Sequence, residues 1–192
     1  MARPKKSHIY NVNASSLCFI GDIHGGVNDI IGFINNYDIR DAVLMFCGDI
    51  GLGFHNCDYK FIALNKEAKS RNVNIFFVRG NHDCPSWFNG VKLGMTNLKA
   101  VKDYSVVSII TPTGYTHNVL CVGGAVSVDR VSRTTNITWW EGECCYYDEK
   151  RLNELKDNNI DIDYVCTHTN PSFCEPFTKA GVENWIHWDV YL

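Results

Sequence analysis

Six side chains that can bind a metal ion or transfer a proton follow four short apolar segments of this chain, each where the segment ends. They are Asp22, His24, Asp49, Asn81, His82 and His168. Carboxylate, imidazole and amide oxygen together suit divalent ions such as manganese, iron or zinc. Taken singly, Asp22 could cap a helix, and Asp49 or Asn81 could occupy a turn. Their recurrence at four segment ends favours a metal site.

The segments before these residues predict how they are positioned. These apolar, β-rich runs cover residues 17–20, 42–47, 73–78 and 164–166. Continuous apolar runs of this length are typical of strands buried on both faces. Apolar residues at helical spacing in 27–37 and 58–71 predict a helix in each of the first two gaps. This order predicts parallel strands with right-handed crossovers, whose carboxyl ends form the edge where ligands bind.

The second half of the chain shows a different pattern. Residues 99–101, 104–110 and 118–122 predict shorter strands, with a turn at 111–114, and favour an antiparallel stretch in a second sheet. Residues 147–156 predict a helix. The expected fold is α/β, a four-layer α/β/β/α sandwich of two mixed sheets flanked by helices. We expect one domain over 1–192, in which 1–15 is an N-terminal tail or edge segment.

Composition narrows the class of protein. With 192 residues, 45% apolar and 20% charged, the chain is typical of one ordered globular domain. A net charge of −3 gives no overall attraction to nucleic acid, which is not excluded as a partner but is unsupported. No apolar run approaches the roughly 20 residues of a membrane span, and the N-terminus lacks the apolar core of a signal peptide, so we predict a cytoplasmic protein. Nine cysteines without a C-x-x-C pair indicate reduced thiols, and a cysteine-based zinc or redox site has only that count behind it.

The ordered motifs resemble those of the calcineurin-like metallophosphoesterases. The matching stretches are Gly-Asp-Ile-His-Gly (21–25), Gly-Asp (48–49), Gly-Asn-His-Asp (80–83) and Thr-His (167–168). Residues 123–125, 129–130 and 139–143 also resemble small bacterial and phage members. The resemblance implies two divalent metal ions, manganese foremost with iron, zinc or nickel as alternatives. It also implies hydrolysis of a phosphoester by a hydroxide that bridges both ions.

The same resemblance implies a division of the metal ligands. Asp22 and His24 would bind the first metal, and Asn81 and His168 would bind the second. Asp49 would bridge the two, because a carboxylate has two oxygens to offer.

Roles in chemistry and substrate binding follow from the same comparison. His82 would donate a proton to the leaving oxygen or stabilise its charge, and Asp83 would orient His82 by accepting its other ring N–H. Arg79, Arg130 and Arg133 are candidate phosphate contacts, with a structural role beside the loop as the alternative for Arg79. Phosphoprotein phosphatases of the superfamily carry an arginine soon after the bridging aspartate, and residues 48–54 contain none. A small phosphomonoester, a nucleotide or a phosphodiester is therefore the expected substrate.

One motif of the family has no counterpart here. The family pattern ends with Gly-His-x-His, which supplies one further histidine to each metal, whereas only His187 follows His168 in this sequence. We expect residues 171–192 to begin an incomplete C-terminal region, with His187 in packing or exposed. The alternatives to an active enzyme are an inactive fragment with weakened metal binding and a non-catalytic binding module on the same fold. The oligomeric state stays open.

Overall fold

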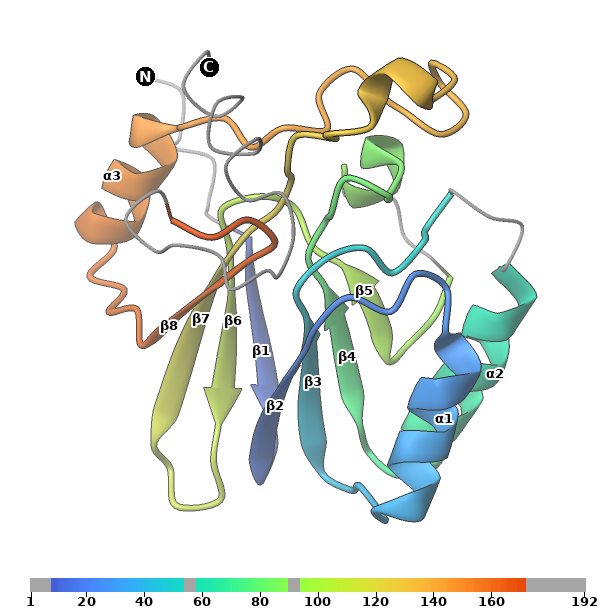
Figure 1. The fold of residues 1–192 in the computed structure, drawn as a ribbon. Helices are drawn as coiled ribbons and strands as arrows, with labels where there is room; N and C mark the ends of the chain where they lie inside the picture. Colours follow the sequence, from blue (N-terminus) through green and yellow to red (C-terminus); the bar gives the residue numbers. More distant parts are fainter. Residues whose placement is uncertain (1–7, 54–57, 90–93, 172–192) are drawn as a thin grey trace.

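The computed structural model describes residues 8–53, 58–89 and 94–171, which form two four-stranded sheets with helices outside them (Figure 1). The first sheet has the strand order β2-β3-β4-β5, and all neighbouring strands are parallel. Its strands are β2 (Ser16–Ile20), β3 (Ala42–Phe46), β4 (Asn74–Phe77) and β5 (Leu98–Ala100). Helices α1 (Val27–Asn36) and α2 (Asp58–Ser70) lie on its outer face.

The second sheet is mixed and has the order β1-β6-β7-β8. It contains β1 (Ile9–Asn13), β6 (Ser105–Ile110), β7 (Thr116–Val122) and β8 (Tyr164–Thr167). The β6–β7 pair is antiparallel, and the β1–β6 and β7–β8 pairs are parallel. Helix α3 (Glu149–Asp157) lies outside this sheet, and two short 3-10 helices, η1 (Pro85–Phe88) and η2 (Arg130–Ser132), lie in loops (Figure 1).

Three apolar clusters separate the four layers. Side chains alternate across a strand, so in β3 Leu44 and Phe46 pack toward α1 and α2, while Val43 and Met45 pack toward the second sheet. Leu155 of α3 packs on the opposite face of the second sheet. The structure therefore confirms the α/β/β/α sandwich. In its described part, no helix is both long and apolar enough to cross a membrane.

Two details of the strand arrangement differ from the predictions. The strand predicted at 99–101 belongs to the first sheet as β5, parallel to β4, so that sheet is wholly parallel and not mixed. The runs at 17–20 and 164–166 were predicted to be buried on both faces, but Phe19 is 41% exposed and Val165 is 59% exposed. Both belong to strands that end the sheet order, where a neighbour is present on one side only. Strand pairing is a long-range contact, and local apolarity does not reveal it.

Candidate metal centre

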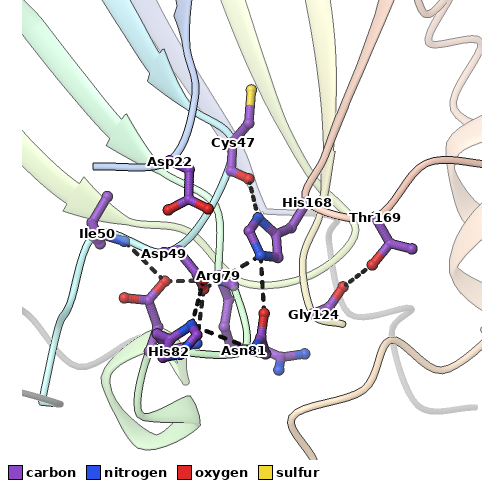
Figure 2. Close-up of polar contacts among 12 residues, drawn as sticks. Asp22, Cys47, Asp49, Ile50, Arg79, Asn81, His82, Gly124, His168 and Thr169 are labelled. Carbon is purple, nitrogen blue, oxygen red and sulfur yellow. Dashed lines mark hydrogen bonds and ion pairs between the residues drawn. The ribbon is translucent and has the colours of Figure 1, made fainter. Parts of the chain in front are cut away.

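The residues of the four motifs meet at one end of the sandwich, beyond the carboxyl ends of β2, β3, β4 and β8 (Figure 2). The first three strands belong to the parallel sheet, whose carboxyl ends lie at one edge. Strand β8 belongs to the other sheet, and it brings His168 across to the loop after β3. There, Nδ1 of His168 lies 2.7 Å from the carbonyl oxygen of Cys47. The site is thus built by both sheets together.

Asp49 is the centre of this arrangement and is only 2% exposed. Its Oδ1 lies 3.3 Å from Nε2 of His168. Its Oδ2 lies 2.6 Å from Nδ1 of His82 and 3.9 Å from Nε2 of His24. The two oxygens of one buried carboxylate therefore face different imidazoles.

The remaining predicted ligands complete the group. Nε2 of His24 lies 3.0 Å from Oδ1 of Asp22, and Nε2 of His168 lies 3.1 Å from Oδ1 of Asn81. The structure thus brings all five predicted metal ligands together. Among the carboxylate, imidazole and thiol groups of the described residues, ligand atoms within 4.8 Å of one another form two triads that share Asp49: Asp22 with His168, and His24 with His82. This grouping differs from the predicted pairs in two ways. Asp22 groups with His168, and His82, predicted to stand off the metals, groups with His24 and contacts Asp49 directly.

The backbone is held in an unfavourable conformation at two of these residues. His24 has φ 41° and Asp49 has φ 51°, in the left-handed region that non-glycine residues rarely adopt. Two backbone hydrogen bonds connect the loops that carry them, from the His24 N–H to the Asp49 carbonyl (2.8 Å) and from the Gly25 N–H to the Ile50 carbonyl (3.1 Å). Such strain is typical of functional sites, where the surrounding structure enforces it.

Gly80 is required by the close approach of the loop after β4 to Asp49. A Cβ atom at position 80 would lie 2.0 Å from Oδ1 of Asp49 and 2.3 Å from its backbone nitrogen. Both atoms belong to the buried Asp49 and cannot move aside without displacing its carboxylate.

The substitution Gly80→Ala is therefore expected to displace Asp49 and to lower metal affinity by at least about tenfold, as loss of ligand orientation does. Manganese titration of the purified variant measures this. Gly114→Ala is the control, because no atom lies within 4 Å of a Cβ there, although its φ of +83° also strains an alanine. Equal metal affinities for the two variants would contradict the prediction.

The charges at the site support one another. Burial alone would raise the pKa of Asp49, but hydrogen bonds and charge from His168 and His82 outweigh it and hold that pKa below its usual range. Burial would lower the pKa of His168, and its contact with Asp49 raises it instead. Burial and the nearby charge of Asp49 raise the pKa of Asp22. At neutral pH the site therefore retains a carboxylate at Asp49, the form that binds cations.

His82 has a defined tautomer. Nη2 of Arg133 donates a hydrogen bond to Nε2 of His82, since a guanidinium has no acceptor. The ring proton must then lie on Nδ1, which donates to Asp49. Arg133 also pairs with Asp129 at 2.7 Å, and its side chain is only 6% exposed. Of the three predicted phosphate-binding arginines, Arg133 is the one that contacts a motif residue from a buried position beside the metal ligands.

Asp83 has different partners from those predicted. Its carboxylate is fully buried and accepts hydrogen bonds from the backbone N–H groups of Gly80 (2.8 Å), Gly51 (2.8 Å), Leu52 (3.0 Å) and Ile50 (3.4 Å). Nδ1 of His82 faces Asp49 instead. Asp83 thus ties the loop after β3 to the loop after β4. Two loops whose backbone N–H groups point inward need an acceptor, and Asp83 supplies it.

Arg79 is also structural, as the alternative interpretation had it. It is 4% exposed and donates to the carbonyl oxygens of Gly123, Gly142, Glu143 and Cys144. It also forms an ion pair with Asp103 at 3.0 Å. These contacts occupy the guanidinium and favour the structural role over the predicted contact with phosphate, which stays a prediction. Arg130 is exposed, and its guanidinium lies over the Trp139 ring at 4.1 Å; its contact with substrate stays a prediction.

Two residues at the site were not predicted as functional. Ser127 and Glu143 are 3% and 2% exposed, and Nδ2 of Asn81 donates to Oγ of Ser127 at 3.2 Å. Glu143 lies in the Trp-Trp-Glu-Gly-Glu stretch at 139–143, where nothing in the sequence distinguishes a buried glutamate from an exposed one.

Comparison with known proteins agrees with this geometry. The family model described as calcineurin-like phosphoesterase matches residues 15–188, which include all the motif residues discussed above. A search of curated proteins finds no match. Family members hydrolyse phosphoesters with the help of metal ions, and the cluster around the buried Asp49 offers the ligands for that chemistry. The chain belongs to the calcineurin-like phosphoesterase family.

Proposed function

We propose that this protein hydrolyses a small phosphoester with a pair of divalent cations, manganese foremost and iron, zinc or nickel as alternatives. The observation that carries the proposal is the position of Asp49. Its Oδ1 faces His168 and its Oδ2 faces His24 and His82, so each oxygen has its own set of neighbouring ligands. A carboxylate in that position fits two cations at once.

The five ligand side chains fit such a pair by their chemistry. Asp22 and His24 would hold one cation, Asn81 and His168 the other, and Asp49 both. Imidazole, carboxylate and amide oxygen suit manganese, iron and zinc. When bound, the cations would lower the pKa of a water molecule and neutralise charge on the phosphoryl oxygens.

His82 and Arg133 are proposed to act on the substrate. His82 donates from Nδ1 to Asp49, which leaves Nε2 directed at the guanidinium of Arg133. A planar guanidinium matches a phosphoryl group in geometry and charge. We place Arg133 on the phosphate in the complex, which frees Nε2 of His82 to take up a proton. The resulting imidazolium then lies beside the leaving oxygen as proton donor or charge stabiliser.

A small substrate is favoured over a phosphoprotein. The stretch after Asp49 contains no arginine, and its backbone N–H groups at Ile50, Gly51 and Leu52 already bind Asp83. This loop is thus committed to structure. We propose a phosphomonoester, a nucleotide or a phosphodiester as substrate.

A cytoplasmic location is part of the proposal. The seven cysteines within the described residues are all free thiols, and the Cys166 thiol donates a hydrogen bond to Sγ of Cys47 at 3.6 Å with no disulfide between them. Free thiols in such numbers are typical of a reducing compartment.

Removal and return of metal test the proposed function. We expect the protein treated with chelator to hydrolyse p-nitrophenyl phosphate and bis-p-nitrophenyl phosphate at background rate. Added manganese should raise the rate at least about 10²-fold above that background, because metal ions supply several kcal/mol of transition-state stabilisation. Manganese without protein is the control. The ratio of the rates with p-nitrophenyl phosphate and bis-p-nitrophenyl phosphate distinguishes a monoesterase from a diesterase. A folded protein that binds no metal and stays inert with both substrates would instead indicate a binding module.

A further inference from the structure

The side-chain amide of Asn81 has one orientation that can bind a cation, and the structure selects it. Only Oδ1 of an asparagine can act as a metal ligand, because the NH₂ group has no lone pair to offer. Oδ1 of Asn81 faces Nε2 of His168 at 3.1 Å, on the side of Asp49. Nδ2 donates to Oγ of Ser127 at 3.2 Å. Nδ2 also lies 3.4 Å from Nδ1 of His82, but that nitrogen donates its own proton to Asp49 and so offers Nδ2 no acceptor. The partner at Ser127 therefore decides which end of the amide faces the metal position.

Glu143 determines what Ser127 can do. Its Oε1 accepts a hydrogen bond from the backbone N–H of Ser127 at 2.8 Å, and its Oε2 accepts from the Ser127 hydroxyl at 2.6 Å. A short hydrogen bond to a carboxylate holds the hydroxyl proton strongly. Oγ of Ser127 is then left with lone pairs alone toward Asn81, and an acceptor can face only the NH₂ end of the amide. Glu143 is 2% exposed, so water does not compete for these contacts.

We propose that Ser127 and Glu143 are positioning residues for the metal centre: together they hold the Asn81 amide with its oxygen toward the cation site. The inference rests on the proposed function, in which Asn81 is a metal ligand. A purely structural role is the alternative, in which the two residues only brace the loop after β7. That alternative predicts lower stability with unchanged metal affinity.

Two variants separate these roles. Ser127→Ala removes the acceptor and leaves the amide free to rotate. Glu143→Gln keeps the size of the side chain and reverses the hydrogen bonds. Its oxygen must still face the Ser127 N–H, so its NH₂ donates to Oγ, and the hydroxyl proton turns to Asn81. That arrangement selects the wrong end of the amide for a metal.

The experiment is manganese titration of the full chain by calorimetry, with ¹⁵N NMR of the Asn81 side-chain amide in the metal-free protein. We expect the wild type to bind two ions, and each variant to bind one of them about 10- to 100-fold more weakly, as loss of an outer-shell partner does. Ser127→Thr keeps the hydroxyl and should restore both affinities. Ser108→Ala is the matched control, because Ser108 is also buried and bonds an asparagine amide, that of Asn118, within the second sheet.

The outcomes distinguish this inference from the proposed function. A wild type that takes up no manganese refutes the proposed function. If both Ser127→Ala and Glu143→Gln bind two ions with wild-type affinity, the inference is overturned and the proposed function is not. The metal-free spectra decide the hydrogen bond itself. The signal of the Asn81 side-chain amide should shift in Ser127→Ala and keep its position in Ser127→Thr. An unshifted signal in Ser127→Ala also overturns the inference.

Discussion

Replacing Asp49 with asparagine is expected to abolish metal-dependent hydrolysis while the fold persists. The substitution keeps the size of the side chain and leaves one oxygen to accept from the backbone N–H of His82, which lies 2.7 Å from Oδ1. It removes the charge and one of the two oxygens on which both cations depend. Loss of several kcal/mol of charge stabilisation corresponds to a fall in kcat of about 10³-fold or more.

Hydrolysis of p-nitrophenyl phosphate under saturating manganese measures this fall, together with the number of ions bound. The matched control is Asp163→Asn at the opposite end of β8, where the carboxylate accepts only from the backbone N–H of Asn118 among its described hydrogen bonds. That variant should keep wild-type activity. Full activity in Asp49→Asn would refute the bridging role of Asp49 and with it the binuclear site.

Replacing Asp83 with asparagine is expected to lower the free energy of unfolding by about 2–4 kcal/mol, since buried donors lose their charged acceptor. The carboxylate accepts from four backbone N–H groups in two loops, and an amide can accept on one side only. Its NH₂ group would face backbone donors at close range. Burial and the charge of Asp49 raise the pKa of Asp83. The N–H groups of Gly80, Leu52 and Gly51 oppose that rise, so the backbone contacts offset part of the penalty of burying the charge.

Urea unfolding of the metal-free protein measures the change, because without metal no ligand binding contributes to stability. Asp163→Asn is the internal comparison: its exposed carboxylate accepts one described hydrogen bond, from the backbone N–H of Asn118, so this variant should unfold within about 1 kcal/mol of the wild type. If Asp83→Asn unfolds at the wild-type urea concentration, the loops do not depend on this carboxylate. The pair of variants therefore separates a carboxylate that joins two loops from one that accepts a single hydrogen bond at the surface.

Local patterns in the sequence predicted the elements and the general location of the site. Helices at 27–37 and 58–71 and strands at 17–20, 42–47 and 73–78 are present within one or two residues of the predicted bounds. Apolar periodicity determines such elements because it reflects burial along a few turns or residues. Parallel strands end at one edge, so the polar residues that follow them had to meet there.

The partners of individual side chains were decided by the tertiary structure. The sequence made both Arg79 and Arg133 candidate phosphate contacts. In the structure, Arg79 binds carbonyl groups of the segment at 142–144, whereas Arg133 contacts His82. Asp83 was likewise expected to pair with His82, but it accepts from backbone N–H groups, that of Gly80 in its own loop and that of Gly51 in the loop after β3. His187 and residues 172–192 lie outside the described residues.

What the sequence by itself determined is the set of chemical groups and the strand ends that carry them. What only the tertiary structure decided is which atoms meet: His168 arrives from the other sheet, and Glu143 reaches Asn81 through Ser127. The physical reason is the range of the interactions. Apolar periodicity acts between near neighbours in the chain, whereas these hydrogen bonds join residues that only the packing of two sheets and their loops brings together.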